Sequence, residues 1–159
     1  MFFRKNKYID LHMHSCYSDG TDTPKRLVQK AYKKGLKTIA ITDHDCISGI
    51  EEGRNEAIEY DIDFIPGVEF SAKYKKTMHI LGYFPNGDIE NVNPLIDVLR
   101  KNREERNPKI IKKLCELGYP ITMDDVRVQS SSGDNISRLH IARAIVDKGY
   151  AVSIREAFH

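Results

Sequence analysis

Residues 9–20 read Ile9-Asp10-Leu11-His12-Met13-His14-Ser15-Cys16-Tyr17-Ser18-Asp19-Gly20. The apolar residues that open this stretch favour β structure and predict a short buried strand. His12 and His14 are two positions apart, and in an extended chain residues at that spacing point to the same face. Asp19 follows at a turn for which Gly20 supplies conformational freedom. A His-x-His pair alone is more often solvated or hydrogen-bonded than metal-bound, but two imidazoles and a carboxylate suit zinc, manganese or iron.

The chain that follows alternates between predicted helices and strands. The first helix is expected to have Thr23 as its N-cap and Pro24 in its first position, and to end at Gly35. The other predicted elements of this half are a strand at 37–41, a helix at 47–60 with Ile50 and Ile58 buried, and strands at 63–71 and 76–83. This β-α-β-α-β order is typical of a parallel α/β sheet or barrel.

Further candidate ligands lie on the later strands. His44 follows the second strand, Glu69 lies late in the third and His79 lies within the fourth. Chemistry collects at the C-terminal ends of the strands in parallel α/β folds, so these side chains are expected to converge on one rim. Each has a simpler interpretation: Asp43 and Asp45 as helix caps, Glu69 as a solvent-facing residue and His79 as a core histidine. Taken together, they favour a metal site.

Size and composition restrict the class of protein. The chain has 159 residues and a net charge of +2, with 30% charged residues of both signs. This indicates one domain, or one domain with a small insert, and no surface built to wrap a polyanion. Three cysteines without C-x-x-C spacing argue against a disulfide framework and favour a cytoplasmic location. Residues 1–7 do not resemble a signal peptide, and no apolar stretch is long enough for a membrane helix.

The second half is predicted to be entirely helical. A long helix is expected at 93–117, interrupted near Asn107-Pro108, and a short one is expected to begin at Thr122. A loop at 130–134 precedes a helix that Ser137 caps and that ends at Gly149, and Ser153 is expected to start another. The strand–helix alternation therefore stops near residue 90.

Several motifs resemble those of the PHP (polymerase and histidinol phosphatase) family. They are His12-Met13-His14-Ser15-x-x-Ser18-Asp19-Gly20, Ile41-Thr42-Asp43-His44-Asp45, Pro66-Gly67-Val68-Glu69 and His79-Ile80-Leu81-Gly82-Tyr83. The resemblance implies a metal-dependent phosphoesterase on a distorted (β/α)7 barrel that holds two or three divalent ions (Mn, Zn or Fe). It implies that His12 and His14 hold one metal, that Glu69 bridges it to a second which His79 also binds, and that Asp19 and His44 hold the third.

The helical half resembles an insert of one PHP branch. Members of that branch remove the 3′-phosphate from nucleoside 3′,5′-bisphosphates or trim RNA from its 5′ end. Residues 137–144 resemble the branch pattern (S/G)-R-P-H-x-A-R-A, with Leu139 in place of proline. The resemblance implies that Arg138 and His140 contact substrate phosphate, whereas the simpler interpretation is an amphipathic helix with surface arginines. The implied division is a barrel part at 1–90 and an all-helical insert at 91–159.

The family barrel has further strands whose His-Pro and Asp-x-His motifs complete the metal shell. This sequence reaches Phe158-His159 without them. We therefore expect a fragment or a truncated relative that carries the N-terminal part of the barrel. Full activity is expected from a longer parent, because the six candidate ligands are too few to saturate three metals.

The expected function is hydrolysis of a nucleotide phosphate monoester or diester, at a 3′,5′-bisphosphate or an RNA 5′ end, by a metal-bound hydroxide. In this scheme Asp43 orients His44, which is a ligand, and His140 is the general acid. The alternatives are a histidinol-phosphate phosphatase, a polymerase-associated PHP domain, a truncated non-catalytic metal- or nucleotide-binding module, and a thiolate nucleophile at Cys16 or Cys46. The expected partner is a nucleotide or short RNA, with no membrane and no obligate protein partner.

Overall fold

The computed structural model describes residues 8–75, 77–130 and 135–159. The stretch at 1–7, Lys76 at the predicted start of the fourth strand, and the predicted loop at 130–134 apart from Ser130 lie outside these residues. The chain divides into two compact units, of which the first ends at Ile96 and the second begins at Asp97. Each unit is described separately below.

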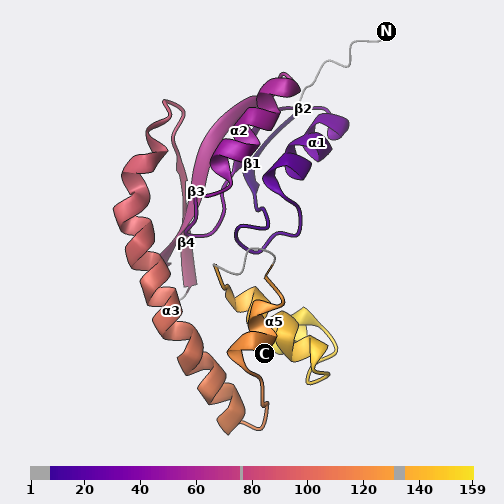
Figure 1. Ribbon diagram of the computed structural model, residues 1–159, viewed down its shortest axis with the longest axis vertical. Coiled ribbons are helices and arrows are strands. Elements are labelled where there is room, and N and C mark those ends of the chain that lie inside the picture. Colours follow the sequence, from indigo (N-terminus) through magenta and orange to yellow (C-terminus); the bar gives the residue numbers. More distant parts are fainter. Residues whose placement is uncertain (1–7, 76, 131–134) are drawn as a thin grey trace. The chain divides into compact units, whose positions relative to one another are not determined.

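The first unit is an α/β structure (Figure 1). Its elements are β1 (Tyr8–Met13), α1 (Pro24–Lys34), β2 (Leu36–Ile41), α2 (Ile50–Glu59), β3 (Asp63–Lys73), β4 (Thr77–Tyr83) and a 3₁₀ turn, η1 (Asp88–Val92). The predicted alternation of strands and helices and the α/β class are therefore confirmed.

The four strands form one sheet in the order β1-β2-β3-β4. β1, β2 and β3 are parallel, but β4 runs antiparallel to β3, with His79 opposite Ser71. The predicted parallel arrangement is confirmed for β1, β2 and β3 but does not extend to β4. A parallel crossover needs a dozen or more residues, and the short segment between β3 and β4 suffices only for a hairpin.

The sheet curls so that its two edge strands approach each other. The hydroxyl of Tyr83, at the end of β4, donates a hydrogen bond of 2.9 Å to the carbonyl oxygen of Leu11 in β1. β2 and β3 lie between these strands in the sheet order, so a flat sheet would hold them about 14 Å apart. The curl therefore lets side chains from all four strands meet on one side.

Helices α1 and α2 bury their apolar sides with residues of the sheet. Val28 of α1, Ala57 of α2 and Ile39 of β2 are completely buried in one cluster. Thr23 caps α1 as predicted, since its side chain accepts a hydrogen bond from the amide of Arg26. The prediction that Ile58 is buried was wrong, because it is 70% exposed on α2.

α2 begins later than the sequence pattern predicts. It starts at Ile50 with Gly49 as N-cap, not at residue 47. The residues after β2 instead continue beside β3, where His44 forms a parallel bridge with Glu69. Asp43 and Asp45 are therefore not helix caps.

The regular secondary structure in the described part of the second unit consists of helices. Its elements are α4 (Met123–Arg127), α5 (Arg138–Asp147), α6 (Ile154–Ala157) and most of α3 (Asn93–Glu116), which starts in the first unit. Figure 1 shows α3 as one continuous coil, so the predicted interruption near Asn107-Pro108 was wrong. Pro108 has no backbone N–H, so α3 lacks one hydrogen bond to the carbonyl oxygen of Glu104. Glu104 is exposed to solvent.

The core of the second unit is aliphatic. Ile111 of α3, Val126 of α4 and Ile141 of α5 are buried together in it. The predicted N-caps Thr122 and Ser137 each form a capping box at the start of α4 and α5. None of the helices among the described residues is both long and apolar enough to span a bilayer.

Candidate metal centre

Four histidines from different parts of the first unit surround the carboxylate of Glu69. Its Oε2 atom lies 3.1 Å from Nε2 of His12, 3.0 Å from Nε2 of His14 and 3.4 Å from Nδ1 of His44. Its Oε1 atom lies 3.0 Å from Nδ1 of His79. Glu69 is buried although it is acidic, so the simpler interpretation of it as a solvent-facing strand residue does not apply.

Each imidazole reaches Glu69 for a definable structural reason. His12 lies within β1 and His14 directly follows it, which places both on the same face. His44 is held by backbone bonds on either side of it, from the amide of Glu69 to the carbonyl of Asp43 and from the amide of Asp45 to the carbonyl of Glu69.

His79 reaches the cluster because β4 is antiparallel. It lies near the start of β4, and that end of β4 pairs with the end of β3 beyond Glu69. In a parallel strand the same position would lie at the opposite edge of the sheet from His14 and His44. The reversal therefore brings His79 to the edge where the first three strands end.

The candidate ligands form three overlapping groups. In each group one donor atom per residue lies within 4.8 Å of the others: His12, His14 and Glu69; His14, Asp19 and His44; and His44, Glu69 and His79. Asp19 joins through Oδ1, 3.3 Å from Nδ1 of His14, and Oδ2, 3.5 Å from Nε2 of His44. Imidazole and carboxylate donors at this separation fit divalent transition metals, so the residues present are chemically suited to such ions.

Asp43 anchors the loop that follows β1. Its carboxylate accepts hydrogen bonds from the amide of Ser15 at 2.7 Å, from the hydroxyl of Ser15 at 2.5 Å and from the hydroxyl of Ser18 at 2.5 Å. Oγ of Ser18 also lies 3.3 Å from Nδ1 of His14. Because the Ser18 proton goes to Asp43, His14 can donate from Nδ1 and keep Nε2 available as a ligand.

The role that the sequence interpretation gave Asp43, to orient His44, stays a prediction. The described bonds link Asp43 through Ser18 to His14. Ser15 and Ser18 were not singled out for this function. Their signal was present as two small polar residues that follow the His-x-His pair, but their partner lies more than 20 residues away in sequence.

Asp45 performs a similar function for β3. Its carboxylate accepts bonds of 2.7 Å from the amide and from the hydroxyl of Ser71, two residues beyond Glu69. Asp45 has a φ of 48°, a left-handed conformation that aspartate tolerates better than most residues. Glu69 is therefore held between the backbone bonds next to His44 and the hydrogen bonds that Ser71 donates to Asp45.

The charges of the cluster stabilise one another. Burial alone would raise the pKa of Asp19, but hydrogen bonds and charges of His14 and His44 outweigh it and lower this pKa well below its ordinary value. Burial likewise opposes ionisation of Glu69, but its bond with His12 and the charges of His44 and His14 lower its pKa. Burial opposes protonation of His14, but the bond and charge of Asp19 raise the pKa of His14.

The metal-free chain is therefore expected to gain most stability from this cluster in mildly acidic solution. Protonated His14 contributes stability that is complete below its ordinary pKa of 6.5 and is lost as the pH rises through the raised value. Ionised Asp19 and Glu69 contribute above their ordinary values of 3.8 and 4.5, and lose that contribution as the pH falls. Urea unfolding of chelator-treated protein at a series of pH values measures this dependence. In His14→Gln, the loss of stability as the pH rises should disappear. An unchanged profile in that variant would contradict the assignment.

Gly20 is required for a steric reason. The sequence interpretation assigned it conformational freedom, but it is not among the glycines with positive φ in the described chain. Its amide donates to the carbonyl of Ser15 at 2.9 Å. A Cβ atom here would lie 2.2 Å from the carbonyl oxygen of His14, closer than any real contact allows.

Gly20→Ala is expected to lower the free energy of unfolding by about 1–3 kcal/mol or more, because backbone must move to admit the methyl group. It should also weaken metal binding, since His14 and Asp19 lie on the displaced loop. Thermal unfolding and metal titration measure the two effects. Gly118→Ala is the control: with φ of +89° and open space around it, it should lose stability while metal affinity stays unchanged. Equal metal affinity in Gly20→Ala would refute the steric account.

Residues 10–126 match the PHP domain family. The chain belongs to this family. Similar curated proteins include a 5′-3′ exoribonuclease of Haemophilus influenzae, 34% identical over 96% of this chain and 55% of that protein. A 3′,5′-nucleoside bisphosphate phosphatase of Chromobacterium violaceum is 33% identical over 94% of this chain and 53% of that protein. The chain thus spans about half the length of the curated relatives it matches.

Solved structures agree with the PHP assignment. A protein of Bifidobacterium adolescentis, named as an inferred metal-dependent phosphoesterase, superposes with a TM-score of 0.84 at 33% identity, over 94% of this chain and 53% of that one. An amidohydrolase of Chromobacterium violaceum, solved with bound sulfate and no metal, gives a TM-score of 0.83 at 33% identity over the same shares. The α/β fold as the N-terminal part of a PHP barrel is thereby confirmed.

The two predicted substrate contacts of this PHP chain lie in the second unit. Arg138 is the first residue of α5 and is exposed. His140 is buried, and its Nδ1 atom accepts a 3.0 Å hydrogen bond from the amide of Ser137. His140 therefore closes the capping box that begins α5, and its roles toward substrate and in catalysis stay predictions.

Proposed function

We propose that this chain is part of a metal-dependent phosphoesterase that hydrolyses a phosphate ester of a nucleotide. The substrate is a nucleoside 3′,5′-bisphosphate or the 5′ end of RNA. The observation that supports this most is the convergence of four imidazoles on Glu69, because such a set of donors serves metal chemistry and is unnecessary for folding alone.

The relatives support the choice of substrate. The Haemophilus influenzae relative is named an exoribonuclease and the Chromobacterium violaceum relative a nucleoside bisphosphate phosphatase, each about one-third identical to this chain. Both names describe hydrolysis of phosphate esters of nucleotides. Since the chain spans about half of each protein, we assign the activity to the longer protein of which the chain forms part.

Each candidate ligand has a proposed place in two or three metal sites. His12, His14 and Glu69 would hold one divalent ion, and His79 would bind a second ion that Glu69 bridges to the first. Asp19 and His44 would hold a third. Bound manganese, zinc or iron would supply a hydroxide nucleophile near neutral pH and would neutralise charge on the phosphoryl oxygens.

The protein's own groups would prepare this site. Asp43 and Ser18 would keep Nδ1 of His14 protonated, so that its Nε2 atom faces the shared centre. Arg138 would bind a phosphate of the substrate through its guanidinium fork. His140, whose Nδ1 accepts the backbone bond of the capping box, would donate a hydrogen bond from Nε2 to a phosphate oxygen, and to act as the predicted general acid it would first have to give up that backbone bond and take a proton at Nδ1. The helical insert, from residue 91, would thus serve the substrate.

A cysteine nucleophile fits the site poorly. Burial raises the pKa of Cys16, and the charges of Asp43 and Glu52 raise it further. The thiolate, which is the reactive form, is therefore scarce at neutral pH. Cys16→Ser should keep the metal-dependent activity of the longer protein.

A phosphate-release assay tests the proposal. The longer protein, supplied with manganese, is offered a nucleoside 3′,5′-bisphosphate, 5′-phosphorylated RNA and histidinol phosphate, with chelator-treated enzyme as control. Faster release from either nucleotide supports the proposal. Preference for histidinol phosphate would move the protein to another PHP branch. Metal binding without release from any substrate would indicate a non-catalytic module.

A further inference from the structure

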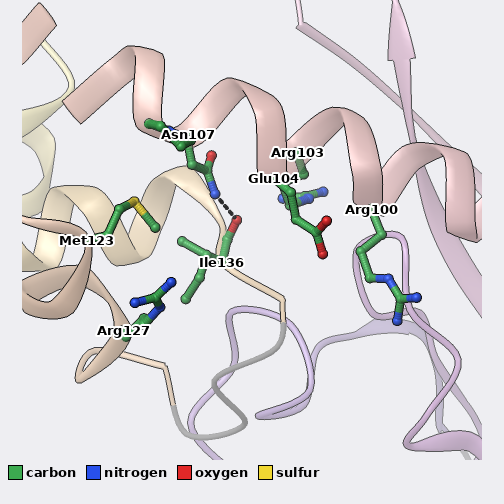
Figure 2. A pocket seen from close by; sticks show the side chains of 8 residues that line it. Arg100, Arg103, Glu104, Asn107, Met123, Arg127 and Ile136 are labelled. Atoms are coloured by element: carbon green, nitrogen blue, oxygen red, sulfur yellow. Dashed lines mark hydrogen bonds between the residues drawn. The ribbon is translucent and has the colours of Figure 1, made fainter. Parts of the chain in front are cut away.

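A pocket in the second unit carries an unusual concentration of arginines (Figure 2). Its volume is about 320 Å³, at the lower end of the range for small-ligand sites. Its lining residues are Arg100, Arg103, Glu104, Asn107, Pro108, Met123, Arg127 and Ile136. All of them belong to the second unit, and none is a candidate ligand of the metal centre.

The charge of this pocket follows from helix geometry. Arg100, Arg103, Glu104 and Asn107 are spaced three, four and seven positions apart, so they share one face of α3. Arg127 of α4 lies across from that face in Figure 2. Three guanidinium groups and one carboxylate therefore line the pocket, and guanidinium stays charged at any pH that the protein meets.

The outer two arginines have only weak surface partners in the described structure. Arg100 lies 3.3 Å from Asp97 and Arg127 lies 2.8 Å from Asp124, and all four side chains are more than half exposed. Exposed pairs of this kind contribute about 0–1 kcal/mol, so an anion with better geometry can replace them. Arg103, in contrast, is buried.

The wall of the pocket is fixed by Asn107. Its side-chain amide donates a hydrogen bond of 3.0 Å to the carbonyl oxygen of Ile136, which Figure 2 shows as a dashed line. Its side-chain oxygen accepts two hydrogen bonds from Arg106. Asn107 thereby ties α3 to the segment just before α5. Met123 and Ile136 give the pocket an apolar side. A fixed wall with arginines on two helices and an apolar side suits a small anion that carries an organic group.

We propose that this pocket binds a phosphate group, and specifically a phosphate of a nucleotide. Guanidinium pairs with phosphate oxygens through two parallel hydrogen bonds, and three such groups around one pocket favour phosphate over a single carboxylate. The choice of a nucleotide rests on the proposed function, whereas the choice of phosphate rests on the pocket alone. The site would hold substrate through contacts separate from those of the metal ligands.

Calorimetry on the full chain after chelator treatment tests this, because phosphate then cannot bind through metal. The probes are inorganic phosphate, adenosine 3′,5′-bisphosphate and adenosine. Both phosphates should bind and adenosine should not. Tighter binding of the bisphosphate identifies a nucleotide as the ligand, and equal binding identifies free phosphate as the source. Binding of adenosine as tight as that of the bisphosphate would overturn the proposal.

Variants locate the site. Arg100→Gln and Arg127→Gln remove exposed charges and should fold normally, and each should weaken phosphate binding about tenfold, the effect of losing hydrogen bonds to a charged group. Arg155→Gln on α6 removes the same charge from an exposed position outside the pocket and should have no effect. If Arg138→Gln abolishes binding while the two pocket variants behave like Arg155→Gln, the pocket is not the site. Absence of phosphate release from every substrate would contradict the proposed function, but it would not change the result of this binding experiment.

Discussion

Glu69→Gln is expected to lower the affinity of the chain for manganese or zinc more than about 100-fold. Loss of a partner that merely orients a metal ligand already costs about 10–100-fold, and Glu69 offers its own oxygens to two of the three candidate groups. The amide also removes the negative charge that four imidazoles share. Elemental analysis and metal titration measure the loss. In the longer protein, phosphate release should fall by at least the same factor at limiting metal.

Two further variants sharpen that experiment. Glu59→Gln makes the same change at an exposed position at the end of α2 and should bind metal as the unmodified chain does. Glu69→Asp keeps the charge but shortens the side chain, so partial affinity is expected. Undiminished metal content in Glu69→Gln would remove Glu69 from the metal centre and with it the observation that carries the proposed function.

Asp43→Ala is expected to lower the free energy of unfolding by about 2–4 kcal/mol. It leaves the amide and hydroxyl of Ser15 and the hydroxyl of Ser18 without their acceptor, and each buried group left unsatisfied costs about 1–3 kcal/mol. The expected loss is smaller than the sum of these three costs, because the substitution also removes a carboxylate that is unfavourable to bury. Burial accordingly raises the pKa of Asp43. Urea unfolding with and without metal gives the value.

The same substitution should also weaken metal binding, because His14 loses its link through Ser18. Asp43→Asn keeps one acceptor and should lose about half as much stability, so it remains measurable if the alanine variant does not fold. Asp88→Ala, at an exposed position on η1, should change stability by less than about 0.5 kcal/mol. An effect of Asp43→Ala no larger than that of Asp88→Ala would show that the carboxylate does not anchor the loop.

The local elements could be predicted because their causes are local. Thr23, Thr122 and Ser137 cap helices by bonding amides two or three residues away, and that spacing is visible in the sequence. The six candidate ligands could also be found, since imidazole and carboxylate at the ends of apolar runs stand out. The pattern near Asn107-Pro108 misled, because a proline that usually breaks a helix is tolerated within α3.

Sequence therefore established the α/β alternation and the helix caps and singled out the candidate ligands, since each depends on residue type and on neighbours a few positions away. The direction of β4, the curl that joins Tyr83 to Leu11, and the partners of Asp43 and Gly20 required the folded chain. Those features depend on groups brought together across the sheet from positions many residues apart. Spacing along the chain carries no record of which distant hydroxyl or carbonyl will lie within 3 Å of a given side chain.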